Sequence, residues 1–196
     1  SIDSASGKMN IADDIVTHRQ LMGIPLQPCD LDFTTCLYRY EKPASPHLSV
    51  KLANAVLDFK IITKSTQQLQ QSYDAVLLEG AGGLLVPITE QLLTLDYIAE
   101  QGYPVILVTS GRLGSINHTL LSLEAIKARG LTLHSVIYNH IHDSAAQTDD
   151  EITNSTIDYL KNYLARHYPN SYWLQMAQQI NSTIGNNNLA LPLDFI

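Results

Sequence analysis

Residues 76–87 read VLLEGAGGLLVP, and this stretch decides the fold that we expect for the chain. Three apolar residues lead into one carboxylate, Glu79, and then into three glycines in four positions, Gly80, Gly82 and Gly83. An apolar run without alternation is typical of a parallel strand buried on both faces. Ligands of open α/β sheets bind at the carboxyl ends of the strands, where glycines let the backbone approach an anion. The alternative interpretation is a tight turn with Glu79 solvated.

Composition narrows the class of protein. The chain has 196 residues, 45% hydrophobic and 16% charged, with a net charge of -7, which favours one domain with a real core and argues against a general nucleic-acid surface. No apolar run approaches the roughly 20 residues of a membrane span, and the start lacks a signal-peptide pattern. We therefore expect a soluble cytoplasmic protein that binds neither nucleic acid nor membrane. Cys29 and Cys36 are expected to be free thiols.

Strands and helices alternate regularly from residue 73 onward. Strands are expected at 76–79, 104–110 and 133–139, and helices at 92–101, 116–129 and 152–167. Strands separated by helices of this length form βαβ units, which predicts a parallel sheet with helices on both faces.

The first part of the chain is predicted to be mainly helical. Helices are expected at 11–22, between an Asn10 cap and Gly23, at 48–54 and at 59–71. A loop is expected at 25–32, a short strand at 33–40, and another loop at 181–188.

Polar groups follow each expected strand. Glu79 ends the first, Thr109 and Ser110 end the second, and Asn139 ends the third. Because the carboxyl ends of parallel strands share one edge of a sheet, these groups are candidates for a common ligand site. Residues 114–117 enter a helix, whose free N–H groups can bind a carboxylate or phosphate. Asn139 offers a donor and an acceptor to an adenine edge, and the structural alternative is that it is a turn residue. For Ser115 the structural alternative is a plain helix cap.

Several motifs together resemble the dethiobiotin synthetase family. They are EGAGG at 79–83, LGSINHTLL at 113–121, SVIYN at 135–139, PASPHLSV at 43–50 and NIADDIV at 10–16. The resemblance runs from about residue 10 to residue 164 and implies a P-loop NTPase-like α/β fold and a homodimer. It also implies closure of a cyclic urea from 7,8-diaminononanoate, CO2 and ATP. One amine, as a carbamate, attacks the γ-phosphoryl group, and the second amine closes the ring as phosphate leaves.

The resemblance assigns roles at the glycine-rich turn. Glu79 matches a carboxylate that coordinates Mg2+, and Asp14 is the second, with Asp13 as the alternative; a small hard cation takes such oxygen ligands. The backbone at Gly80, Gly82 and Gly83 would approach the substrate diamine and the γ-phosphate.

The resemblance also assigns roles later in the chain. Asn139 matches the asparagine that reads adenine. Ser115, Ile116 and Asn117 match the helix start that, in the dimer, receives the carboxylate of the neighbour's substrate. Apolar residues of this helix, namely Ile116, Leu120, Leu121 and Leu123, exceed one buried stripe, which predicts a two-fold interface.

The first eight residues, SIDSASGK, allow two interpretations. They resemble the phosphate loop, with Ser4 and Gly7 at the nucleotide, Lys8 as the catalytic phosphate lysine, and Met9 where a metal-binding hydroxyl belongs. Alternatively, Ser6 and Gly7 match the small-residue and glycine pair of the substrate loop, and Lys8 is a solvated lysine.

Both interpretations predict a single domain that lacks part of the N-terminal P-loop unit. Two alternatives to an active synthetase therefore stay open. One is a catalytically impaired paralogue that serves as a binding or dimerisation partner, and the other is a P-loop ATPase of another type.

Overall fold

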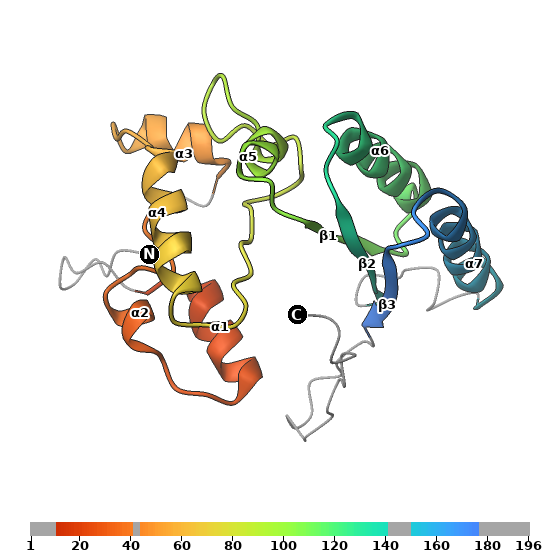
Figure 1. The fold of residues 1–196 in the computed structure, drawn as a ribbon, viewed down its shortest axis with the longest axis horizontal. Coiled ribbons are helices and arrows are strands. Elements are labelled where there is room, and N and C mark those ends of the chain that lie inside the picture. The colour runs from red at the N-terminus through yellow and green to blue at the C-terminus, as the bar shows by residue number, and fades with distance from the viewer. Residues whose placement is uncertain (1–10, 41–43, 141–149, 177–196) are drawn as a thin grey trace. The chain divides into compact units, whose positions relative to one another are not determined.

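The structure is a computed structural model that describes residues 11–40, 44–140 and 150–176 (Figure 1). The chain forms two compact units that divide between Thr94 and Leu95. The predictions for residues 1–10, which include Ser4, Ser6, Gly7, Lys8 and the Asn10 cap, lie outside the described residues, as does the loop predicted at 181–188.

The first unit contains four helices among its described residues: α1 (Asp13–Met22), α2 (Pro28–Leu31), α3 (Pro46–Leu52) and α4 (Phe59–Gln70). Gly23 closes α1 as predicted: its φ of 67° turns the chain back, so that the N–H of Ile24 donates to the carbonyl of Arg19 and the N–H of Gly23 to that of Gln20, each at 3.1 Å. The side chain of Asp58 caps α4 by accepting the N–H of Lys60 at 3.0 Å. The three helices predicted in this part of the chain are confirmed, and each of their ends lies within two residues of the predicted position.

The prediction of a strand at 76–79 is wrong, because the structure has no strand there. The segment is extended but belongs to no ladder, and the side chains of Leu77 and Leu78 are 82% and 45% exposed. A strand exists only where a neighbour completes its hydrogen bonds, and no described segment pairs with this one.

Two further predictions for the first unit are corrected. Residues 33–40 form turns and irregular chain instead of a strand, and Phe33 has a φ of 69°, which no strand residue adopts. The loop predicted at 25–32 contains α2, a single helical turn. Its capping box pairs Gln27 with Asp30, and Pro28 occupies the first helical position.

The second unit is a parallel α/β unit, entered through α5 (Thr94–Gln101). It continues as β1 (Val105–Ser110), α6 (Ser115–Ala128), β2 (Leu133–Asn139), α7 (Asp150–His167) and β3 (Tyr172–Met176), with all three strands parallel in the order β1-β2-β3. Two right-handed crossovers in the same direction place α6 and α7 on one face of the sheet (Figure 1). The predicted alternation is confirmed from the helix at 92–101 onward, whereas the strand predicted before that helix is absent from the described structure and β3 was not predicted.

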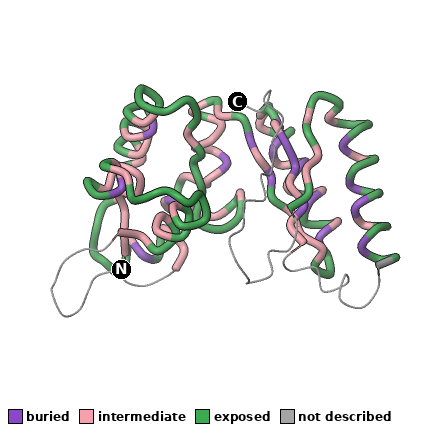
Figure 2. Tube along the Cα trace, turned by 90° about the horizontal axis from the view of Figure 1, so that it is seen from below, coloured by how far each residue is buried: buried purple, intermediate pink, exposed green. Residues whose placement is uncertain are grey.

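The buried core lies between this sheet and its two crossover helices. It includes Val105 and Leu107 of β1, Val136 and Tyr138 of β2, and Leu123 and Ile126 of α6. On α7 the buried positions are Thr153, Ile157, Leu160 and Leu164, which recur once per turn (Figure 2). Of the helices described, none is long and apolar enough to cross a bilayer.

Candidate functional site

Glu79 lies beside the first helix of the chain. Its Oε2 is 3.7 Å from Nε2 of His18 on α1, and the glutamate side chain is 77% exposed. Asp14 precedes His18 by four residues and therefore lies on the same face of the helix. Asp13 and Asp14 are both exposed in the first turn of α1. The helix face that carries Asp14 thus turns toward Glu79, as the predicted pairing of the two carboxylates requires.

These carboxylates suit a hard cation that keeps much of its water. Among the described residues, no three Asp, Glu, His or Cys side chains converge on one point. Mg2+ is typically held by one or two carboxylates together with substrate phosphates and water, and not by a cage of protein ligands. The oxygen donors of Glu79 and Asp14, both open to solvent, fit that coordination chemistry.

The glycine-rich turn after Glu79 is fixed to the start of α5. Thr94 donates its N–H and its hydroxyl to the carbonyl of Val86, each at 3.0 Å. A Cβ on Gly80 would approach Cγ2 of Thr94 to 3.0 Å, and Gly82 has a φ of 89° that strains any other residue. The backbone itself therefore favours glycine at Gly82, whether or not a ligand contacts it, whereas a Cβ at Gly80 would only require the Thr94 side chain to shift by a few tenths of an ångström.

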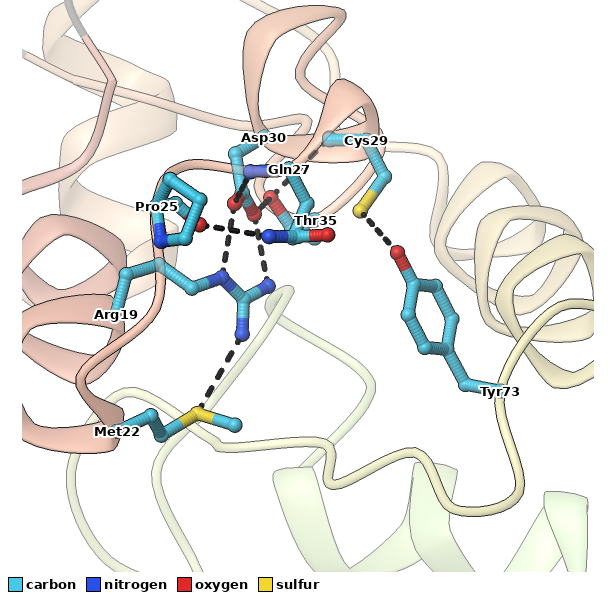
Figure 3. A network of polar contacts seen from close by, with 8 residues as sticks. All are labelled: Arg19, Met22, Pro25, Gln27, Cys29, Asp30, Thr35 and Tyr73. Carbon is cyan, nitrogen blue, oxygen red and sulfur yellow. Dashed lines mark hydrogen bonds and ion pairs between the residues drawn. The ribbon is translucent and has the colours of Figure 1, made fainter.

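A polar network holds α1 against α2 (Figure 3). The Arg19 guanidinium donates to both carboxylate oxygens of Asp30, at 2.8 and 2.9 Å, and the N–H of Gln27 and the hydroxyl of Thr35 donate to the same carboxylate. Asp30 is almost completely buried. The bonds from Arg19, with those from Gln27 and Thr35, hold the pKa of Asp30 below its ordinary value although burial opposes this. The network orients α1 and, with it, Asp14 and His18.

The carboxyl ends of the three strands meet at one edge of the second unit. In the ladder, Ser110 of β1 aligns with Asn139 of β2, which aligns with Met176 of β3. Parallel alignment therefore brings the predicted strand ends Ser110 and Asn139 together. Asn139 is half-buried at this edge, a position from which its side chain can reach a ligand.

The start of α6 carries a buried hydroxyl that has no hydrogen-bond partner in the described structure. Gly114 caps the helix with a φ of 86°. Ser115 is 8% exposed, and its buried Oγ has no hydrogen-bond partner in the described structure. Ser115 lines a cavity of about 180 Å³ against β1, whose other lining residues are Leu107, Val108, Thr109, Ser110, Arg112, His118, Thr119 and Ser122. The N–H of Ser115 already donates to the carbonyl of Arg112 at 2.9 Å, so the anion site predicted at this helix start stays a prediction that depends on Ile116, Asn117 and the Ser115 hydroxyl.

The other residues predicted at α6 differ in their exposure to solvent. Ile116 and Leu120 are half-buried, Asn117 is exposed, and Leu121 is 60% exposed, so the exposed apolar surface expected there exists. The prediction that Leu123 contributes to an interface is wrong. Its side chain is 0% exposed in the core because it points toward the sheet.

Sequence reasoning missed the contacts of four side chains. His18 carried no signal, because a histidine on a short helix has no fixed partner in sequence. The pair of His140 and Gln175, at the ends of β2 and β3, depends on a strand that was not predicted. Asp30 could have been found from the capping-box pattern Q-P-x-D.

Comparison with known proteins first defines the class. A family model described as an AAA domain matches residues 27–183, most of the chain, in agreement with the parallel sheet and its crossover helices. The chain therefore has a P-loop NTPase-like α/β fold, as predicted.

Curated relatives then define the family. The chain is 57% identical over 134 residues to ATP-dependent dethiobiotin synthetase BioD 2 of Haemophilus influenzae, covering 68% of this chain and 70% of the relative. It is 47% identical over 162 residues to ATP-dependent dethiobiotin synthetase BioD of Chlorobaculum tepidum, covering 83% and 66%. For BioD 2 of Pasteurella multocida the identity is 46% over 166 residues, covering 85% and 76%. The chain belongs to the dethiobiotin synthetase family.

Proposed function

We propose that the chain closes the cyclic urea of dethiobiotin from 7,8-diaminononanoate and CO2 at the expense of ATP. The relatives support this ligase chemistry and do not support the impaired paralogue or another type of P-loop ATPase. The observation that carries the proposal in the structure is the approach of Glu79 to the helix face that bears Asp14. A cytoplasmic location stays a prediction.

Glu79 and Asp14 would hold Mg2+ near the phosphates of ATP, with Asp13 as the alternative second ligand. When bound, the cation neutralises charge on the phosphoryl group during transfer. The chain's own contribution is to position reactants. The turn at Gly80, Gly82 and Gly83 presents backbone to the diamine and the γ-phosphate without side chains in the way. The glycine-rich turn and the carboxylates thus act on the same end of the nucleotide.

Two further contacts follow in the second unit. Asn139 would hydrogen-bond the adenine edge from the end of β2. The N–H groups at the start of α6 and the buried hydroxyl of Ser115 would bind the substrate carboxylate. A carboxylate oxygen would be the acceptor that this hydroxyl lacks in the described structure.

We also propose that the protein acts as a homodimer. Leu113 and Leu121, at and near the start of α6, are 99% and 60% exposed. Exposed apolar side chains beside a substrate site are typical of an interface between identical subunits. In such a dimer the helix start of one subunit would receive the substrate of its neighbour.

The test is phosphate release with ATP, bicarbonate as the source of CO2, and 7,8-diaminononanoate, omitting each in turn. We expect release that depends on all three, together with dethiobiotin detected by mass spectrometry. Asp14→Asn should lower turnover at limiting Mg2+ far more than the neighbouring Asp13→Asn. Phosphate release that ignores the diamine would contradict the synthetase, and equal effects of the two variants would contradict the choice of Asp14.

A further inference from the structure

A hydrogen bond between two threonine hydroxyls ties the end of β1 to the second turn of α6. Oγ1 of Thr109 and Oγ1 of Thr119 lie 2.5 Å apart, so one of the two hydroxyls donates to the other. Thr119 is 4% exposed, and Thr109 is half-buried. Among the residues that the structure describes, no other side-chain hydrogen bond joins this strand to this helix.

The loop that connects β1 to α6 contributes little to placing the helix start. Arg112, Leu113 and Gly114 are exposed, and the N–H of Ser115 donates to the carbonyl of Arg112 within the loop itself. Further along α6, Leu123 and Ile126 pack in the core, but apolar burial is non-directional and tolerates small displacements. A hydrogen bond depends steeply on distance and angle, so the threonine pair fixes the first turns of α6 against the strand end.

The threonine pair lies beside the hydroxyl that is proposed to bind substrate. Thr119 follows Ser115 by four residues and therefore lies on the same face of the helix, one turn away. All three hydroxyl-bearing residues, Thr109, Ser115 and Thr119, line the same cavity of about 180 Å³. In that cavity the Ser115 hydroxyl is buried and has no partner among the described residues, whereas the two threonines satisfy each other.

We propose that Thr119, through its bond to Thr109, is a positioning residue for the substrate carboxylate. It holds the first turn of α6 where Ser115 and the helix N–H groups meet that carboxylate. The inference rests on the proposed function, in which this helix start binds the carboxylate of 7,8-diaminononanoate. A helix start that is already in place loses less freedom when the ligand binds, and this preorganisation raises affinity.

The contact should affect binding of the substrate and leave the chemical step alone. The carboxylate stands at the opposite end of the diamine from the reacting amines, so its contacts are equally strong before and during the reaction. Losing them should therefore raise KM for 7,8-diaminononanoate without changing kcat or KM for ATP.

The deciding variant is Thr119→Val, which keeps the shape of the side chain and removes the hydroxyl. We expect KM for 7,8-diaminononanoate, and its dissociation constant from calorimetry on the full chain, to rise about two- to ten-fold, the range expected for one hydrogen bond. Thr109→Val removes the other half of the same bond and should have the same effect. Thr119→Ser keeps the hydroxyl and should bind the diamine nearly as the wild type does.

A matched control and a double variant separate positioning from folding. Thr153→Val makes the same change on α7, where Thr153 is 7% exposed and its hydroxyl has no partner in the described structure, so neither KM should change. In the double variant Ser115→Ala/Thr119→Val, the loss of diamine affinity should be smaller than the sum of the two single losses, because the threonine acts through the position of the serine.

The outcomes distinguish this inference from the proposed function. A wild type that turns over normally, together with a Thr119→Val variant of unchanged KM for the diamine, overturns the positioning role and leaves the synthetase standing. An equal rise in KM for ATP, equal weakening by Thr119→Ser, or full additivity with Ser115→Ala also overturns it. A wild-type chain that neither binds the diamine nor releases phosphate overturns the proposed function and this inference with it.

Discussion

Replacing Asp30 by asparagine should destabilise the first unit by about 3 kcal/mol. The side chain of Asp30 is 0% exposed, and its two oxygens accept bonds from Arg19, Gln27 and Thr35. Asparagine keeps one acceptor oxygen and turns an NH2 group toward the guanidinium, so donors face donors. Removing one partner of a buried ion pair costs about 3–5 kcal/mol, and the lower end applies because Arg19 is 19% exposed.

Thermal unfolding followed by circular dichroism measures this cost. For a chain of this size 1 kcal/mol corresponds to about 2–4 °C, so we expect Tm to fall by about 6–12 °C. The matched control is Asp32→Asn, two residues away, where an exposed carboxylate accepts bonds only from Thr34. It should cost less than about 1 kcal/mol. A Tm for Asp30→Asn no lower than that of the control would refute the reasoning.

The same carboxylate predicts how stability depends on pH. Because the pKa of Asp30 is lower in the folded chain than in the unfolded one, its contribution is complete above the unfolded pKa of about 3.9. The contribution is lost as pH falls through the lowered folded pKa. The difference in Tm between wild type and Asp30→Asn should therefore be constant near neutrality and shrink below about pH 4. A difference that stays constant into strong acid would mean that the charge of Asp30 does not matter.

Three further variants test the site. Glu79→Gln should weaken Mg2+ binding, measured by titration, and leave the free energy of unfolding within about 0.5 kcal/mol of the wild type, because the side chain is 77% exposed; a large drop in Tm would make Glu79 structural. Ser115→Ala should weaken binding of the diamine carboxylate in calorimetry without lowering Tm, since it removes a buried hydroxyl that has no partner. Leu121→Lys should give a monomer in light scattering, whereas Val56→Lys, at an 85% exposed position, should not.

The sequence predicted local helices and the βαβ repeat well. The bounds of β2 match the predicted strand, and α4 differs by one residue, because apolar periodicity and an Asp58 cap are local signals. The segment at 76–79 failed for the opposite reason. Its apolar composition is that of a strand, but pairing depends on a neighbour that composition does not reveal. β3 was missed although Tyr172 and Trp173 favour strands, since five residues show little periodicity.

The candidate site was predictable in its residue types and not in its contacts. Asn139 and Ser110 align because parallel strands end at one edge, which topology alone predicts. By contrast, the approach of His18 to Glu79 joins residues far apart in sequence and depends on how α1 is held by Asp30. Such contacts follow from tertiary packing, which no short motif encodes.

The distribution of buried side chains has a calorimetric consequence. Among the described residues before Leu95, Ile88 alone is both hydrophobic and buried, whereas Asp30, Ser49 and Thr66 are buried and polar. The heat capacity change of unfolding rises with the apolar surface exposed and falls with the polar surface exposed. The first unit should thus contribute little to the heat capacity step, and its unfolding enthalpy should vary little with temperature. Its stability curve is then flat, while the second unit, with the sheet and its apolar helices, supplies most of the curvature and is the part that weakens on cooling.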